Sequence, residues 1–301
     1  NPSDTVHYLR IYKSFLTDGS AFDAAKNIDN YSYIDSIDVK IEEYNGSQLL
    51  QTIVFDTTTS IPKDSGTFAY PLQILYKAHA QLNRAYTYKI IIKNRYTQKT
   101  TTAVTGLVGD VSIKIPVYYI GRRNSITFIP HLQQLEFVKG DNIALAQASF
   151  YLHYSNVYKD LQRKQGEPVI WDIGESKTNR ISYVGENLLR RMKEEIPIDE
   201  EVEYRLIDSI VVHLYTASND LYLYNIAISA STGLNQERLE YTNLKSQSWI
   251  DGEWVEDKNA LGVFASRGHY TLMYNEFSKN TNDSLLNGRY TKHLKFRTYD
   301  Y

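Results

Sequence analysis

Residues 37–46 read Ile-Asp-Val-Lys-Ile-Glu-Glu-Tyr-Asn-Gly, and this stretch decides the fold class. Apolar residues alternate with charged ones, which is the pattern of a β-strand with one buried and one solvated face. Asn45-Gly46 is typical of a two-residue hairpin turn, because both central positions of that turn require positive φ. Residues 49–55 then predict the returning strand of an antiparallel pair.

The same signal recurs on both sides of this hairpin. Residues 6–16, 86–92, 100–104 and 111–115 are rich in β-branched and aromatic residues, with turn residues between them. About seven short strands at this spacing, with little helix, predict an immunoglobulin-like β-sandwich. We therefore expect a mainly β protein whose first domain covers residues 1–117.

Residues 118–301 predict a second β-rich domain with two inserted helices. Strand patterns occur at 144–154 and 205–216, and closing strands are expected at 263–274 and 290–299. The helices are expected at 183–196, where one face is apolar and the other charged, and at 219–230, after Ser218.

Composition excludes several function classes. The 301 residues carry a formal charge of −2, which provides no basic surface for nucleic acid. No apolar run reaches membrane-spanning length. The absence of cysteine excludes disulfides, thiol catalysis and thiolate metal sites. Tyrosine is abundant, with 26 residues, which suits half-buried sheet faces.

The sequence contains few of the patterns that mark catalytic, metal or cofactor sites. The seven histidines have no metal-ligand spacing along the chain, and no glycine-rich phosphate loop occurs, so we expect no metal and no cofactor. Ser266 lacks the glycine context of an exposed nucleophile and is interpreted as structural. The acidic run at 194–203 lacks the order of a calcium loop. We therefore expect no catalytic residues.

The candidate binding residues are Trp249, Asp251 and Trp254, in the segment Trp-Ile-Asp-Gly-Glu-Trp. Asp251-Gly252 predicts a two-residue hairpin turn, which would place the two indoles across from each other. Such a pair on an exposed hairpin could stack on sugar rings or anchor a partner protein. Because tryptophan is usually well buried, the sequence favours the alternative, a hairpin folded back so that the indoles cover the core.

Three further pieces carry a family resemblance. They are Ser-Thr-Gly-Leu-Asn-Gln at 231–236, Tyr-Thr-Asn-Leu at 241–244 and Ala-Leu-Gly-Val-Phe-Ala-Ser-Arg-Gly at 260–268. This C-terminal part resembles a family of Bacteroidetes-type surface lipoproteins of unknown function. In that family the last two pieces follow almost directly, whereas residues 247–260 separate them here. The resemblance implies an immunoglobulin-like N-terminal domain and TonB-dependent outer-membrane receptors as neighbours.

These observations lead to one expected function and two alternatives. We expect a non-enzymatic lipoprotein at the bacterial outer membrane or cell surface, held by an N-terminal lipid upstream of Asn1, that acts in binding or assembly. A glycan or an outer-membrane receptor is the expected partner, and nucleic acid is not. The alternatives are a carbohydrate-active enzyme using carboxylates such as Asp172 and Glu186, and a purely structural surface component.

Overall fold

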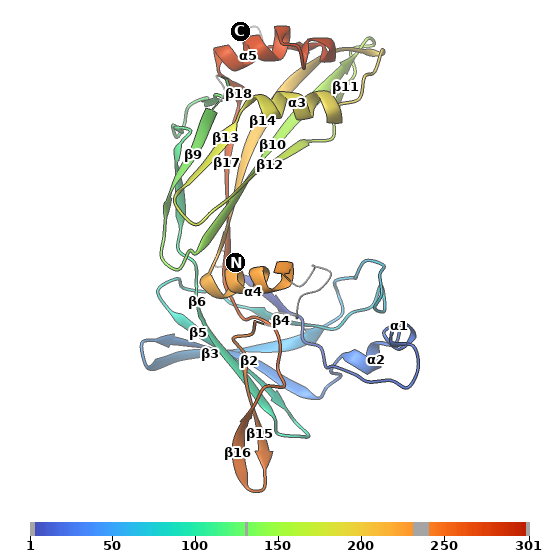
Figure 1. Cartoon of the computed structure of the whole chain (residues 1–301), viewed down its shortest axis with the longest axis vertical. Coiled ribbons are helices and arrows are strands. Elements are labelled where there is room, and N and C mark those ends of the chain that lie inside the picture. Colours follow the sequence, from blue (N-terminus) through green and yellow to red (C-terminus); the bar gives the residue numbers. More distant parts are fainter. Residues whose placement is uncertain (1–3, 130–131, 231–240, 299–301) are drawn as a thin grey trace. The chain divides into compact units, whose positions relative to one another are not determined.

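The computed structural model describes residues 4–129, 132–230 and 241–298. Strand accounts for 46% of the structure and helix for 15%, so the predicted mainly β fold is confirmed (Figure 1). Most neighbouring strands pair in antiparallel fashion. Among the described residues, no helix combines the length and the apolar character needed to cross a membrane.

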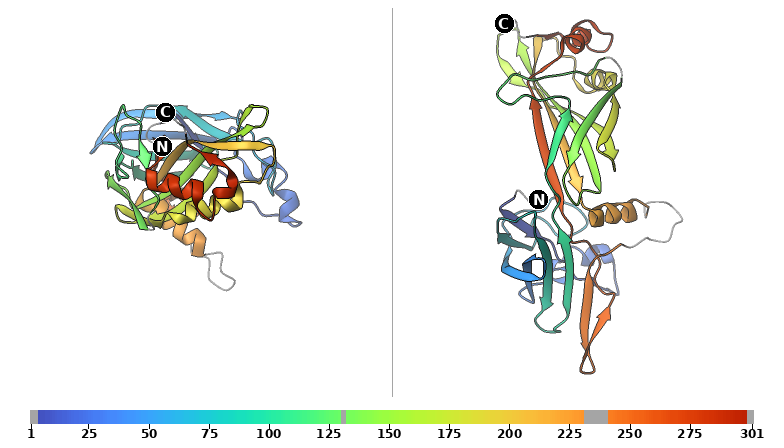
Figure 2. Two further views of the ribbon diagram at one scale, coloured as in Figure 1. Left: turned by 90° about the horizontal axis from the view of Figure 1, so that it is seen from above. Right: turned by 90° about the vertical axis from the view of Figure 1, so that its left-hand side faces the viewer.

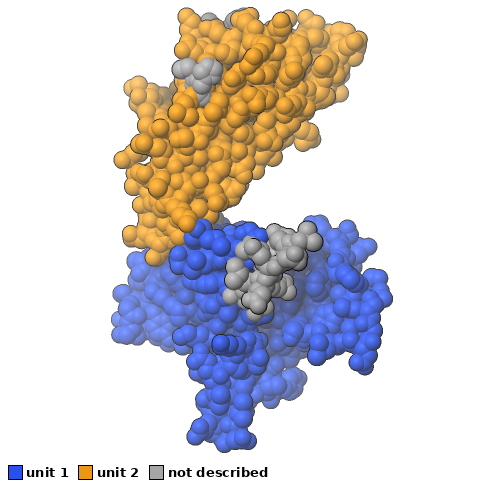
Figure 3. Space-filling view, viewed as in Figure 1, with its two compact units in different colours: residues 1–108, 218–267 blue, residues 109–217, 268–301 orange. Residues whose placement is uncertain are grey.

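The chain forms two compact units, shown in two colours in Figure 3. The first unit contains residues 1–108 and 218–267, and the second contains residues 109–217 and 268–301. The predicted domains, 1–117 and 118–301, differ from these units because the segment 218–267 returns to the first unit. That return depends on strand pairing between residues more than 140 positions apart, as in Lys245 with Thr102.

Eight strands of the first unit follow one continuous path. In spatial order they are β1 (Val6–Leu9), β4 (Leu75–His79), β3 (Gln48–Thr58), β2 (Ile37–Asn45), β5 (Thr87–Asn94), β6 (Thr100–Gly106), β15 (Lys245–Ile250) and β16 (Glu253–Asp257). The path is continuous because β3 pairs along most of its length with β2 and through its last three residues with β4. The strands expected in a sandwich of separate sheets are therefore linked.

The alternation that predicted β2 places its apolar residues in the core of this unit. Ile37, Val39 and Ile41 are buried, together with side chains from β3, β4, β5 and β6. The hairpin is present as predicted, but its turn is one residue further on, because Asn45 pairs with Gln48 and the turn residues are Gly46, with a φ of 58°, and Ser47. Burial of one strand face therefore sets the register of the hairpin.

Three helices accompany the first unit. Ser20 and Asn27 cap the short helices α1 (Ala21–Ala24) and α2 (Ile28–Tyr31) through their side-chain oxygens. Helix α4 (Asn219–Ala230) matches the helix expected at 219–230. The piece 231–236, which carries part of the family resemblance, lies outside the described residues.

The second unit combines a larger and a smaller sheet with a short strand pair. The larger sheet has the order β11 (Arg163–Gln165), β10 (Leu145–Tyr158), β14 (Val202–Ala217), β17 (Arg267–Tyr274), while β12 (Val169–Ser176) also pairs with β10 and β19 (Phe296–Arg297) with β14. The smaller sheet has the order β13 (Arg180–Val184), β9 (Leu132–Lys139), β7 (Val111–Ile115), and β8 (Ser125–Ile126) pairs with β18 (Glu276–Phe277).

An aromatic cluster forms the core of the second unit. Phe128 lies 5.0 Å from Phe150 and 6.0 Å from Tyr183, measured between ring centroids, and Trp171 lies 5.8 Å from Phe150. All four side chains are buried. Strand β10 contributes through the alternation seen in the sequence, because Phe150 lies on its buried face while Tyr151 points to the other side.

The helices of the second unit match the sequence in part. Helix α3 (Glu186–Glu195) lies within the stretch expected at 183–196, and its Leu188, Leu189 and Met192 are buried. Helix α5 (Lys279–Asn287) was missed, and the strand expected at 290–299 was wrong. That stretch contains the 3-10 helix η1 (Lys292–Leu294) and the two residues of β19. Lys295, with a φ of 58°, reverses the backbone between them.

Candidate functional site

The hairpin of β15 and β16 carries all three sequence-predicted binding residues. Its turn has the predicted form, since Asp251 and Gly252 have φ values of 50° and 90°. Trp249 pairs directly with Trp254 across the two strands. The local sequence therefore determined the hairpin and brought the indoles together.

Only the base of this hairpin belongs to the sheet. Residues Lys245, Ser246 and Gln247 of β15 pair with β6, whereas Ser248 to Ile250 pair with β16 alone. The tip consequently extends beyond the sheet of the first unit, as the lowest orange strands in Figure 1 and in the right-hand view of Figure 2 show.

The two indoles are exposed. Trp249 retains 53% and Trp254 retains 47% of full accessibility, and their ring centroids lie 5.2 Å apart at an interplanar angle of 70°. The favoured expectation, that the hairpin folds back and the indoles cover the core, was wrong. It failed because β15 continues beyond its last pair with β6, so that the sheet holds the hairpin only at its base.

The opposite face of the tip is apolar as well. Because directly paired residues share one face, Trp249 and Trp254 lie on one side, while Ile250 and Val255 belong to pairs on the other. Ile250 and Val255 are 49% and 43% exposed. A two-stranded ribbon with large apolar side chains on both faces is unusual on a protein that has no partner there.

Asp257 anchors the base of the hairpin. Its carboxylate accepts hydrogen bonds from the hydroxyls of Ser246 and Ser248 and from the amide of Asn259, and it lies 3.4 Å from Lys99 Nζ. Burial acts to raise the pKa of Asp257, but these hydrogen bonds and the charge of Lys99 hold that pKa well below its usual value. The ionised carboxylate therefore fixes the angle at which the tip leaves the sheet.

Replacing Asp257 with asparagine is expected to loosen the hairpin by about 2 kcal/mol, because hydrogen bonds to a charged acceptor are lost. A depressed pKa stabilises the folded form above the unfolded pKa, so the wild-type contribution is complete above about pH 4 and declines as the pH falls further. Amide hydrogen exchange of residues 246–257 should accelerate in Asp257→Asn. The matched change Glu256→Gln, on the exposed neighbour, should leave the exchange unchanged, and equal acceleration in both variants would contradict the anchoring role.

A cavity of about 440 Å³ lies within the first unit. Core side chains such as Ile41, Phe55 and Tyr88 line it. Polar groups on its wall are engaged within the protein. Ser266 Oγ accepts a hydrogen bond of 3.0 Å from the Val108 amide, which supports the interpretation of Ser266 as structural. The wall is mixed, since Asp4, His7 and Arg267 line it together with the apolar side chains.

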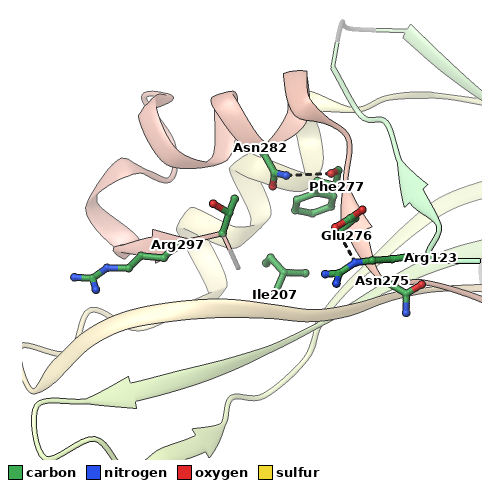
Figure 4. A pocket seen from close by; sticks show the side chains of 8 residues that line it. Arg123, Ile207, Asn275, Glu276, Phe277, Asn282 and Arg297 are labelled. Atoms are coloured by element: carbon green, nitrogen blue, oxygen red, sulfur yellow. Dashed lines mark hydrogen bonds and ion pairs between the residues drawn. The ribbon is translucent and has the colours of Figure 1, made fainter. Parts of the chain in front are cut away.

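A smaller pocket of about 120 Å³ lies in the second unit (Figure 4). Arg123 forms an ion pair of 2.9 Å with Glu276 at its edge, and Asn282 donates a hydrogen bond of 3.0 Å to the carbonyl of Phe277. The rest of the wall consists of Ile207, Asn275, Arg297 and Thr298. This pocket has room for a few water molecules and is smaller than typical ligand sites.

The two carboxylates of the enzyme alternative, Asp172 and Glu186, form hydrogen bonds and an ion pair within the protein. Asp172 accepts hydrogen bonds from Gln147 Nε2 at 2.8 Å and from the amide of Gly174 at 2.9 Å. Glu186 forms an ion pair with Arg289, at 2.9 Å. Neither carboxylate lines the two cavities described above.

The sequence missed one cluster of chemically capable side chains. His213 and His269 are separated by 56 positions but lie on the adjacent strands β14 and β17, with ring nitrogens in hydrogen-bond contact. The contact between His213 and His269 depends on strand order, which no local pattern reports.

Comparison of the chain with models of known protein families and with curated proteins found no match.

Proposed function

We propose that the protein is a non-enzymatic binding protein of the bacterial cell surface that docks a partner protein through the β15–β16 hairpin. The observation that carries the proposal is the exposed pair Trp249 and Trp254 on a tip that extends beyond its sheet. Large aromatic side chains are the most frequent anchors of protein interfaces, because they bury much apolar area at a small cost in conformational entropy.

The geometry favours a protein partner over a sugar. The indoles meet at 70° and therefore form no flat platform for successive sugar rings. Ile250 and Val255 make the opposite face apolar too, which a sugar stacked on the indoles would leave exposed. An apolar groove that encloses the tip would cover both faces.

Charge defines the partner further. Asp251 and Glu253 lie at the turn between the two indoles, and residues 248–257 contain no lysine or arginine. The complementary surface is an apolar groove with basic residues at its rim. A second copy of the same hairpin is disfavoured, because docking tip to tip would bring like charges together.

The cellular setting of the proposal rests on the family resemblance. In that setting a lipid upstream of Asn1 anchors the protein at the outer membrane, and a TonB-dependent receptor is the partner. A carbohydrate-active enzyme with Asp172 and Glu186, or a purely structural surface component, would not need the exposed indoles.

The experiment places a photoreactive benzoyl-phenylalanine at position 250, in the hairpin tip, and in a control protein at position 96. Tyr96 is a matched control, since it is exposed and lies in a turn of the same sheet, between β5 and β6. Each protein is irradiated with outer membranes of the organism that makes it. We expect position 250 to give one cross-linked integral membrane protein that position 96 does not give.

The cross-link should disappear when Trp249→Ala and Trp254→Ala are combined, and it should weaken with added salt because the rim contacts are ionic. Three results would overturn the proposal. They are equal cross-linking from positions 250 and 96, a tryptophan emission shift with neutral oligosaccharides that Trp249→Ala abolishes, and a solution dimer that the same substitution dissociates.

A further inference from the structure

Four aromatic rings form a cluster on the outer face of the larger sheet of the second unit. Tyr151 lies on β10, His213 and Tyr215 on β14, and His269 on β17. The ring centroids of Tyr151 and His213 are 4.1 Å apart, and Tyr215 stacks on His269 at 4.5 Å with an interplanar angle of 6°. Each imidazole therefore has a tyrosine ring against it, which restricts its tilt.

The two imidazoles contact each other through ring nitrogens. His213 Nδ1 lies 2.9 Å from His269 Nε2, and the rings are nearly coplanar, with an interplanar angle of 14°. One nitrogen carries the shared proton and the other accepts it. Each ring therefore directs one nitrogen toward the other ring. Solvent reaches this contact because His269 is exposed.

The surroundings keep this pair available as a ligand. The outward positions of β10 and β14 around the pair carry no lysine or arginine: they are Gln147, Ser149, Tyr151, His153, Ser209, Val211 and Tyr215. The charged neighbours are Asp172 of β12, which is paired with Ser149, and Arg267, which lies two residues before His269 on β17.

We propose that His213 and His269 form a binding site for a divalent transition-metal ion, with Cu²⁺ the preferred ion. Imidazole is a favoured ligand of Cu²⁺, Ni²⁺ and Zn²⁺, and Cu²⁺ binds nitrogen ligands most tightly of the three. At metal–nitrogen distances of about 2.0 Å, neighbouring nitrogens of a square-planar ion are about 2.8 Å apart. The two strands therefore already hold the hydrogen-bonded nitrogens, 2.9 Å apart, close to the separation that chelation requires.

Metal binding requires the two imidazoles to reorient and one of them to change its tautomer. Rotation about the side-chain bonds redirects the two nitrogens, which now face each other, so that both lone pairs point at the metal. The proton between the rings leaves, and the outer nitrogen of the same ring takes one from water, so each ligand stays neutral and no proton is released overall. Among the described residues no group of three His, Cys, Asp or Glu side chains can hold one metal ion, so water completes the coordination.

The bound ion would cross-link two strands that are far apart in sequence. His213 and His269 belong to adjacent strands of one sheet, and a ligand that binds only the folded form raises its stability. The proposal concerns the second unit and is independent of the hairpin in the first. Metal binding and thermal stability therefore provide two separate measurements.

The experiment titrates the full-length protein with CuCl₂, NiCl₂ or ZnCl₂ in a calorimeter, using His213→Gln, His269→Gln and the double variant. We expect one Cu²⁺ site in the wild type, at least tenfold weaker binding in either single variant and no further loss in the double variant, because one remaining imidazole no longer chelates. Excess Cu²⁺ should raise the midpoint of thermal unfolding of the wild type by several degrees, and of the variants by less.

Two control variants test whether the site is specific. His153→Gln removes a histidine on the same sheet face, and His79→Gln removes an exposed histidine of the first unit. Both should retain wild-type affinity. Equal Cu²⁺ binding by the wild type and the double variant, or a loss in His153→Gln as large as that in His213→Gln, would overturn the assignment.

Discussion

Replacing Phe128 with alanine is expected to lower the free energy of unfolding of the second unit by about 4 kcal/mol. The ring is fully buried and lies within 5.0 to 6.3 Å of Phe150, Phe277, Tyr183 and Trp171, measured between centroids. Truncation removes the apolar burial of the ring and leaves a cavity that four rigid aromatic neighbours cannot fill.

The measurement uses Trp171 as the reporter of this unit. Trp249 and Trp254 are first replaced with phenylalanine, so that urea unfolding of the full chain is followed by the emission of Trp171 alone. Phe22→Ala is the matched control, because this ring is 71% exposed and its loss should change stability by less than about 0.5 kcal/mol. Similar unfolding midpoints for Phe128→Ala and Phe22→Ala would contradict the central role of the cluster.

Replacing Arg205 with methionine is also expected to lower the free energy of unfolding of the second unit by about 4 kcal/mol. Here the cause is the loss of hydrogen bonds inside the protein. The side chain is only 2% exposed. Its guanidinium donates hydrogen bonds of 2.7 Å to Asn156 Oδ1 and of 2.8 Å to the carbonyls of Leu294 and Pro197. Methionine has a similar length, but it leaves the buried carbonyl of Leu294 and the partly buried Asn156 Oδ1 without this donor.

The effect should extend to the C-terminal segment. The Arg205 amide also donates to the carbonyl of Lys295, and Arg205 is paired with Phe296 of β19. Hydrogen exchange of residues 292–298 should therefore accelerate in Arg205→Met. Arg297→Met is the control, because Arg297 is exposed, and its ion pair of 3.5 Å with Glu203 and its contact with the Tyr204 ring are each worth about 1 kcal/mol or less. The proposed role is contradicted if both variants unfold at the same urea concentration.

The sequence predicted local structure well where one pattern dominated. Alternation at 37–41 placed β2, and the turn signal at Asn45-Gly46 placed the hairpin with β3 to within one residue, while Asp251-Gly252 placed the turn between β15 and β16. The stretch 290–299 was assigned incorrectly, because its apolar residues serve a 3-10 turn and a two-residue strand. Short segments of that kind carry too few residues for a period to be recognised.

Of the candidate sites, too, the sequence could predict the local contacts but not those that depend on distant strands. The pairing of Trp249 with Trp254 follows from a two-residue turn and could be predicted. The exposure of both indoles could not be predicted, because it requires that β15 extend beyond its last pair with β6. These two strands are far apart in the sequence. The contact of His213 with His269 likewise needs β14 and β17 to be neighbours.

By itself the sequence determined that this is a mainly β protein, where its hairpin turns lie, which side chains of the long strands face the core and which chemical groups are absent. These properties depend on neighbouring residues, whose spacing along a strand is constant. Only the tertiary structure decided that residues 218–267 return to the first unit, that the two indoles project into solvent and that two distant histidines share a proton. Each of these depends on the order of strands in a sheet, which is selected by the burial of the whole core and leaves no mark on any single stretch of the chain.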